Sequence, residues 1–371
     1  MELSSDDSAH IDEVVVLEPD ALVVRWTNRG THVESGGAFE RNLCQLWIFD
    51  AAGLLSLWQQ FEVEHAAEAL LRFDERFSSA ETPPASEVFE NAAARADREL
   101  FRCFNARDWE GVLACAAPEL VFDERRRMVR NTCGRDVWLE QFRFLFDVPA
   151  SRFTTRLLAT RGERLSLNRH CFRGQVADGG GPIAMDDQLA LNEVDGEGHI
   201  VAIVLFDEND PDAARAELDL RFAAGEDESR AASLTVMRQF TSSVASGHWD
   251  PVLALCSPAL VEQDHRPLAV LGTTRGAEAW VRNFRVLADL APDSRYRVDH
   301  FRSTARGFCS VGVWNGTREG GLYELPLVAV IELDEQNRIS RADIYDADQL
   351  ERAVARFEEL APTCTRSRSA P

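Results

Sequence analysis

The residue types best suited to proton transfer gather in the last third of the chain. All three tyrosines, Tyr296, Tyr323 and Tyr345, lie there, and so do the carboxylates Asp264 and Asp343. A phenol and a carboxylate that converge in an apolar pocket form an acid–base pair. The same region holds further candidate ligand-binding residues, namely His265, Trp314 and Asn315. If the protein has a working site, the residue types favour this region.

Composition disfavours several classes of function. The formal net charge of -22 repels phosphate backbones and anionic lipids, so we expect neither nucleic acid nor membrane as a partner. The eight cysteines are scattered, and no histidine stands at zinc-ligand spacing, so we expect no metal and no other cofactor. Gly179 to Gly181 predict a hairpin loop rather than a phosphate-binding loop. The start MELSSDDSAH is acidic and unlike a secretory signal, which predicts a cytoplasmic protein.

An internal repeat organises the chain. Segment 106–126 aligns with segment 246–266 without a gap, and Trp109 falls on Trp249. Three similar endings follow one another along the chain, and the first of them is preceded by sheet-like sequence without the helices that open the later copies. The repeat therefore predicts a truncated unit at 1–80, which has the sheet half and the tail helix only, complete domains at 85–225 and 226–362, and a disordered tail at 363–371.

Apolar spacing predicts the order of elements within a full copy. Leu100 and Phe104 belong to the stripe of a long amphipathic helix, residues 109–115 form a short helix that ends before Pro118, and Trp138 lies on a third helix. Four strand-like stretches and a tail helix follow. Three helices packed on a curved antiparallel sheet make an α+β cone with one open end.

This order resembles the nuclear transport factor 2-like superfamily, which includes ketosteroid isomerase, SnoaL-type polyketide cyclases and limonene epoxide hydrolase. The features that carry the resemblance are the helix-end turn of Asn105, Ala106 and Asp108, the stretch A-P-E-L-V that enters a strand, and a last strand that runs into acidic residues. The resemblance covers nearly the whole chain and implies tandem cone-shaped α+β barrels. Because the superfamily includes many chemistries and many binders, it does not decide the function.

The resemblance also implies site residues. Ketosteroid isomerase has a carboxylate on its first strand that acts as the base. Counting from Asn105 places Glu124 at this position, and Asp264 is the equivalent residue of the last copy. In the mouth of an apolar cone such a carboxylate has a raised pKa and acts as a general base. The two oxyanion donors of that isomerase have no counterpart here. Asp343 resembles an aspartate of limonene epoxide hydrolase that positions water, although the rest of that relay is missing.

Each of these residues also has a structural alternative. Glu124 and Asp264 can form surface ion pairs with neighbouring arginines. Tyr345 can belong to the core, because phenylalanine takes its place in the other copies, and Trp314 can line a pocket or pack in the core. His170 titrates near neutral pH if it faces a pocket, and is otherwise a surface or hydrogen-bonded histidine.

Two functions stay open. One is a small-molecule-binding or assembly module, part of a larger bacterial regulatory protein, in which a second copy or a partner chain completes the truncated unit. The other is a cofactor-independent cyclase, isomerase or hydrolase that acts on a hydrophobic small molecule in the third unit. There Asp264 would be the base and Asp343 or Tyr345 would orient water or substrate, with Tyr323 and Asn315 beside them. A third interpretation has the sheet faces packed together, leaving little cavity.

Overall fold

The computed structural model divides the chain into two units, Met1–Glu81 and Thr82–Pro371. It describes residues 4–18, 21–32, 37–49, 54–66, 68–70, 72–73, 89–175, 182–225, 228–267, 272–318 and 321–360. The predicted loop at Gly179 to Gly181 and the predicted disordered tail at 363–371 lie outside these residues. Within the described ranges, no helix is long and apolar enough to cross a membrane.

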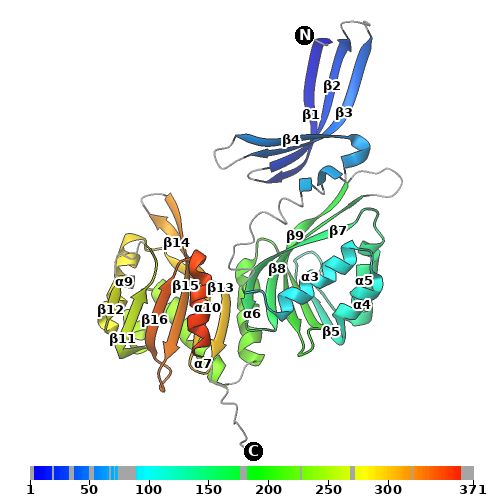
Figure 1. Cartoon of the computed structure of the whole chain (residues 1–371). Coiled ribbons are helices and arrows are strands. Elements are labelled where there is room, and N and C mark those ends of the chain that lie inside the picture. Colours follow the sequence, from blue (N-terminus) through cyan, green and yellow to red (C-terminus); the bar gives the residue numbers. More distant parts are fainter. Residues whose placement is uncertain are drawn as a thin grey trace, which may run out of the picture. The chain divides into compact units, whose positions relative to one another are not determined.

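The first unit is a four-stranded antiparallel sheet in the order β1-β2-β3-β4 (dark to mid blue in Figure 1). Its strands are β1 (Ser4–Glu18), β2 (Ala21–His32), β3 (Ala38–Phe49) and β4 (Leu55–Glu62), and a short 3-10 helix, η1 (Val63–His65), follows. Val23 and Leu46 are fully buried and pack with Ala69 and Phe73, which come after η1. This small cluster is the core of the unit.

The second unit contains a twelve-stranded sheet made of two halves with the same strand order. The first half runs β7-β8-β9-β10-β5-β6, and the second runs β13-β14-β15-β16-β11-β12. Strands β7 and β13 join the halves in parallel through His300 opposite Thr160 and Phe301 opposite Arg161. Within each half the pairs are antiparallel, except for β10 with β5 and β16 with β11.

The strand bounds of the first half are β5 (Ala116–Glu124), β6 (Asn131–Gly134), β7 (Arg152–Arg161), β8 (Leu165–Gln175), β9 (Pro182–Val194) and β10 (Ile200–Asp207). Those of the second half are β11 (Cys256–Asp264), β12 (Thr273–Arg275), β13 (Arg295–Thr304), β14 (Gly307–Arg318), β15 (Gly321–Leu333) and β16 (Ile339–Tyr345). The last strand of each half pairs in parallel with its first long strand, which brings sequence-distant residues to one end of the half.

Three helices cover one face of the first half: α3 (Ala92–Asn105), α4 (Trp109–Cys115) and α5 (Arg135–Phe146). Asn91 and Asp108 cap the first two, since their side chains accept hydrogen bonds from Ala94 N and Gly111 N, both at 2.9 Å. The apolar stripe of α3 is buried against the sheet as its spacing predicts, with Leu100 and Phe104 in one core cluster with Trp138. The short helix expected at 109–115 is α4, although the strand after it already begins at Ala116.

The second half repeats this arrangement with α7 (Glu228–Ala245), α8 (Trp249–Ala254) and α9 (Ala277–Leu290). Further helices cover the opposite sheet faces: α6 (Pro211–Gly225) contacts β7 to β10, whereas η3 (Ala347–Gln349) and α10 (Leu350–Glu358) follow β16, and α10 contacts β14 to β16. Each half is therefore buried on both faces. The predicted α+β class is confirmed, whereas the cone shape and the domain boundaries stay predictions.

Candidate functional site

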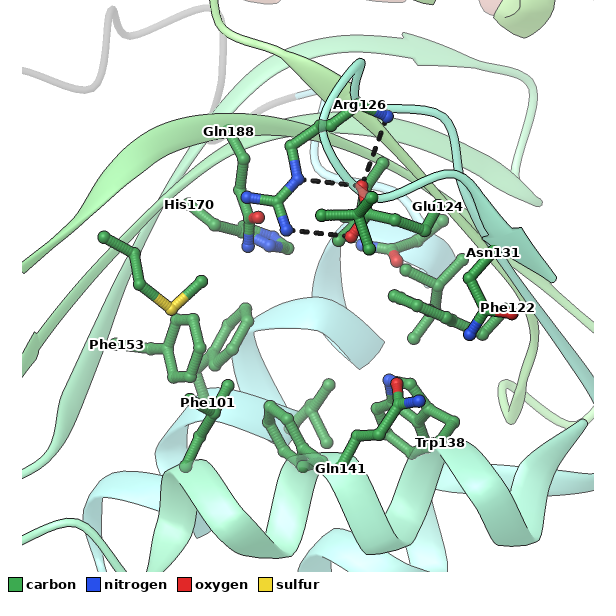
Figure 2. Close-up of a pocket in the computed structure, with 18 residues that line it drawn as sticks. Phe101, Phe122, Glu124, Arg126, Asn131, Trp138, Gln141, Phe153, His170 and Gln188 are labelled. Atoms are coloured by element: carbon green, nitrogen blue, oxygen red, sulfur yellow. Dashed lines mark hydrogen bonds and ion pairs between the residues drawn. The ribbon is translucent and has the colours of Figure 1, made fainter. Parts of the chain in front are cut away.

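A cavity of about 270 Å³ lies between α3, α5 and the first half of the sheet, and we call it the first cavity. In Figure 2, side chains from β8, β9 and the end of β5 gather along one side of it, and aromatic rings together with Gln141 lie along the opposite side. The polar side holds Glu124, Arg126, His170 and Gln188, and the aromatic side Phe101, Trp138 and Phe153. The cavity thus combines an apolar floor with a few hydrogen-bonding groups, as ligand pockets commonly do.

A buried carboxylate of α3 organises the wall of this cavity. Asp97 is 1% exposed and accepts hydrogen bonds from three strands. His170 Nε2 lies 2.8 Å from its Oδ1, Asn192 Nδ2 lies 2.6 Å from the same oxygen, and Thr155 Oγ1 lies 2.5 Å from Oδ2. Because buried charge is costly without such partners, this set of donors is what allows a carboxylate within an apolar helix stripe.

The contact with Asp97 fixes the imidazole of His170. When a carboxylate accepts from Nε2, the proton of the neutral ring stays on Nε2, and Nδ1 is left as an acceptor. Phe101 packs edge-on against the ring, with centroids 4.6 Å apart. No described residue makes a hydrogen bond to Nδ1, and the side chain lines the cavity at 5% exposure. This geometry offers a hydrogen-bond acceptor that becomes a base when the carboxylate stabilises the imidazolium.

Gln188 carries a second unused acceptor. Its side chain on β9 lines the first cavity and is 6% exposed, and its Oε1 is buried without a hydrogen-bond partner among the described residues. Leaving a buried amide oxygen unpaired costs about 1–3 kcal/mol. A ligand that donates a hydrogen bond to this oxygen removes that cost.

An ion pair lies on the polar side of the first cavity. Arg126 Nε and Nη2 donate to the two carboxylate oxygens of Glu124 at 2.7 and 2.8 Å, and Glu124 is buried (Figure 2). Such a two-pronged pair is geometrically specific. Glu124 was expected to be either a general base or a partner in a surface ion pair. The structure shows an ion pair with the neighbouring Arg126, but the carboxylate is buried beside the cavity and does not lie on the surface.

A second cavity, of about 250 Å³, occupies the equivalent place in the second half. Its walls come from α7, α9 and strands β11 and β13 to β16. Aromatic side chains dominate it: Phe240, Trp280, Phe284, Tyr296 and Trp314. Of the residues predicted to form a site in the last third of the chain, Trp314 lines this cavity.

Asp264 does not have the properties expected of a base. Arg266 donates to both of its oxygens, at 2.9 and 2.8 Å, in the same arrangement as Arg126 and Glu124. Burial raises the pKa of Asp264, but the hydrogen bonds and charge of Arg266 outweigh burial and hold the pKa below its usual value. The raised pKa expected for this residue is therefore wrong, and Asp264 stays an ionised partner of Arg266.

Asp343 and Tyr345 face away from the second cavity. On β16 the residue between them, Ile344, lines the cavity and pairs with Asp264, so Asp264 and Asp343 lie on opposite faces of the sheet. The predicted convergence of these carboxylates with Tyr345 does not occur, because alternate residues of a strand point in opposite directions. Tyr345 instead packs under α10 in the core, as its alternative interpretation stated.

Asp343 is the centre of an ion-pair cluster on that outer face. It accepts from Arg341, from Arg356 of α10 and from His265, whose Nε2 lies 3.0 Å away. Burial raises the pKa of Asp343, but these hydrogen bonds outweigh it and bring the pKa down to about 2. His265 stacks on Tyr345 with ring centroids 4.5 Å apart. His265 is therefore part of a structural cluster and does not line the cavity.

The two remaining predicted residues also lie outside the second cavity. The Tyr323 hydroxyl lies 2.6 Å from Ser294 Oγ, which ties β15 to the turn before β13. Asn315 lines a different cleft, of about 390 Å³, which contains several arginines. Within the described ranges, no three His, Cys, Asp or Glu side chains are placed to hold a metal ion.

Sequence reasoning identified His170 but missed the residues that hold it. Asp97 lies within the apolar stripe of α3, between Ala93 and Leu100, and a charged residue in such a stripe was an available signal. The local sequence did not indicate that Gln188 and Asn192 belong to this site. They alternate with apolar residues, which is the usual pattern of polar side chains on a half-exposed strand.

Comparisons with solved structures find similar folds over about a third of this chain. A Mycobacterium tuberculosis protein in complex with estradiol-17β-hemisuccinate is 18% identical over 31% of this chain and 92% of its own, with a TM-score of 0.28. A putative SnoaL-like polyketide cyclase from Jannaschia sp. CCS1 is 12% identical over 35% and 96%, with a TM-score of 0.29. An LEH-like epoxide hydrolase from M. tuberculosis is 13% identical over 35% and 94%, with a TM-score of 0.28. At these scores the likeness carries no argument about activity.

No family model matches the sequence, and no curated protein matches it. The neighbours are SnoaL-like and ketosteroid isomerase-fold proteins. What the chain does has to be argued from its own cavities.

Proposed function

We propose that the protein binds small molecules through tandem SnoaL-like domains, and that the first cavity takes an apolar ligand with at least one hydrogen-bond donor. The observation that carries this proposal is the buried Oε1 of Gln188, which has no partner among the described residues and belongs to a side chain that lines the cavity. Natural proteins rarely leave such an atom unpaired, and a ligand is a physical reason for the exception.

The lining indicates the class of ligand. Phe101, Trp138 and Phe153 supply aromatic surface, which favours a flat apolar body. Gln188 Oε1 and His170 Nδ1 are acceptors, so a hydroxyl or N–H on the ligand fits them better than a carbonyl does. A phenol or an alcohol on a fused-ring body has this chemistry.

A matched pair of probes tests the proposal. Isothermal titration compares 2-naphthol, which has a hydroxyl donor, with 2-methylnaphthalene, which lacks one. We expect the full chain to bind 2-naphthol about tenfold more tightly, as one good hydrogen bond to an otherwise unpaired oxygen provides. The variant Gln188→Met should lose this preference, whereas Gln336→Met, on an exposed turn, should keep it. Equal affinity of the two probes for the wild-type protein contradicts the proposal.

The tandem arrangement and the assembly of the chain belong to the same proposal. Support for two domains, at 85–225 and 226–362, comes from the identical strand order of the two half-sheets. Support for self-association comes from the first unit, where Leu54, Leu57 and Trp58 are exposed. We expect light scattering to give a dimer of the full chain, and Trp58→Glu with Leu57→Glu to give a monomer. A wild-type monomer at high concentration contradicts self-association.

Proton transfer in the first cavity is a second candidate function. It is favoured by the 2.8 Å contact between His170 and Asp97, because a carboxylate behind an imidazole stabilises the imidazolium that forms when the ring takes a proton. Exchange of the hydrogens next to the carbonyl of 1-indanone in D₂O measures this activity. We expect the chain to accelerate exchange and His170→Gln to abolish the acceleration. Exchange at the buffer rate removes this candidate and leaves the binding function in place.

A further inference from the structure

The second cavity has aromatic walls and one carboxyl group that no basic side chain neutralises. Its rings form a continuous cluster: Trp280 and Phe284 have centroids 4.8 Å apart, and Tyr296 and Trp314 have centroids 5.1 Å apart. Phe284 links the two pairs through Trp314 at 5.9 Å. The charged residues that line the cavity are Glu262 and Arg266.

Glu262 projects from β11 into this aromatic environment. It is 8% exposed, and its Oε1 accepts a hydrogen bond from Trp280 Nε1 at 3.1 Å. Oε2 is buried, and no described residue reaches it with normal hydrogen-bond geometry. Burial raises the pKa of Glu262, and its neighbours Thr274 and Trp280 offset this only in part.

The other charges around Glu262 already balance one another. Arg266 donates twice to Asp264, so this arginine and this aspartate form a neutral pair beside Glu262. An ionised Glu262 therefore gives the cavity a net negative charge with no counter-ion among the described residues. A bound cation would neutralise it.

The fold does not need a carboxyl group at this position. In the gapless alignment of the two copies, Glu262 falls on Phe122, which occupies the same place on β5 and lines the first cavity. An apolar side chain there is compatible with a well-packed half-sheet. A buried acid without a cationic partner of its own is costly for stability by comparison, so its presence points to a ligand.

We propose that the second cavity binds a protonated amine with an apolar body, Glu262 accepting its N–H and the aromatic rings surrounding its charge. Aromatic rings attract an ammonium group through their electron-rich faces, and the attraction grows when the site is dry. The amine supplies Glu262 with a well-formed hydrogen-bond donor and supplies the positive charge that the cavity lacks. This site is independent of the first cavity and of its proposed ligand.

Two probes of similar shape and different charge test this inference. N,N-dimethylbenzylamine is protonated at pH 7.5, whereas N,N-dimethylbenzamide is neutral and offers only a carbonyl acceptor. By isothermal titration into the full chain we expect the amine to bind at least tenfold more tightly. If Glu262 instead acted as a protonated donor, the amide would bind as tightly as the amine, and the inference would be overturned.

Variants assign the effect to one residue. Glu262→Gln keeps the shape of the side chain and removes the charge, and we expect it to weaken amine binding at least tenfold. Glu335→Gln removes one charge on an exposed turn of the same half and should bind the amine like the wild type. Gln188→Met, in the first cavity, should also leave amine binding unchanged, so this test and that of the proposed function can fail separately. Unchanged amine affinity in Glu262→Gln contradicts the inference.

The wild-type protein provides a readout that does not depend on a folded variant. The charged groups that face Glu262 are Asp264 and Arg266, and the lowered pKa of Asp264 and raised pKa of Arg266 keep both ionised at pH 4.5 and above. Of these three groups Glu262, whose pKa burial raises, is the first to gain a proton as the pH falls, so we expect amine affinity at pH 4.5 to be at least about twofold below that at pH 7.5. Equal affinities at the two pH values, or no binding up to millimolar amine, contradict the inference.

Discussion

His170 Nε2 and Asp97 Oδ1 are 2.8 Å apart, although the two residues lie on a strand and a helix that are distant in sequence. The contact is buried behind the wall of the first cavity, and Asn192 and Thr155 complete the shell of Asp97. One carboxylate therefore connects α3 to β7, β8 and β9 and orients the imidazole that lines the first cavity.

Removing the charge of Asp97 should destabilise the second unit. Asp97→Asn places an amide where three donors converge, so at least one of them loses its acceptor. We expect a loss of about 2 kcal/mol in the free energy of unfolding, measured by urea denaturation. The control is Asp136→Asn, whose side chain is 97% exposed and which should change stability by less than about 0.5 kcal/mol. Equal stability of the two variants would mean that the Asp97 shell contributes little.

The ion pair of Glu124 and Arg126 in the first cavity should contribute more to stability than an exposed pair of the same type. Arg126→Gln leaves the buried carboxylate of Glu124 without its bidentate partner, and we expect a loss of about 3 kcal/mol. Arg143 pairs with Asp147 at an exposed site of the same half, and Arg143→Gln should cost less than about 1 kcal/mol. The double variant Glu124→Gln with Arg126→Gln should recover part of the loss. No recovery would mean that the arginine acts mainly through packing.

The pairing of β7 with β13, which connects the two half-sheets, should make the second unit less stable to unfolding in mild acid. His300 contacts Thr160 through Nδ1 at 3.0 Å, and burial lowers the pKa of His300 to about 4. The unfolded chain takes up the histidine proton near pH 6.5 while the folded chain does not, so stability falls as the pH drops from about 6.5 to about 4. We expect a loss of about 3 kcal/mol across this window, absent in His300→Gln. Urea unfolding at pH 7, 5.5 and 4.5 measures it, and parallel curves for the two proteins contradict it.

Asp343 should make a separate contribution at lower pH. Its pKa is lowered to about 2, so its stabilising effect is complete above the unfolded pKa near 4 and is lost as the pH falls from about 4 to about 2. We expect the wild type to lose about 2 kcal/mol more than Asp343→Asn in this window, and no difference in slope between pH 5 and 7. A wild-type slope equal to that of the variant below pH 4 would show that the arginine cluster does not stabilise the carboxylate.

Local sequence signals predicted much of the fold. The apolar stripe of α3 and the short α4 follow from helical spacing, and Asp108 is a capping residue by type. The join through His300 and Thr160 had no such signal, because it consists of two residue pairs between strands distant in sequence. Pairing of this kind depends on tertiary contacts and not on local patterns.

The site was harder to predict than the fold. Successive residues of β16 point to opposite faces of the sheet, so Asp343 and Ile344 lie on different faces. Both faces are buried, one under α10 and the other against the second cavity. The pattern of polar and apolar residues therefore did not reveal which face held the pocket. The concentration of tyrosines in the last copy was misleading for two of the three, since Tyr345 packs in the core and Tyr323 bonds to Ser294, whereas Tyr296 lines the second cavity. Glu262 was overlooked because it lies two residues before the more conspicuous Asp264.

Nitrogen-15 spectra of the histidine side chains test the central claim most directly. Of the eight histidines, His170 is assigned by its loss in His170→Gln. We predict that its proton lies on Nε2, where Asp97 accepts it, and that saturating 2-naphthol shifts its Nδ1 signal while the other histidine signals stay in place. A proton on Nδ1, or a His170 signal that does not respond to bound 2-naphthol, would contradict the assignment of the first cavity as the ligand site.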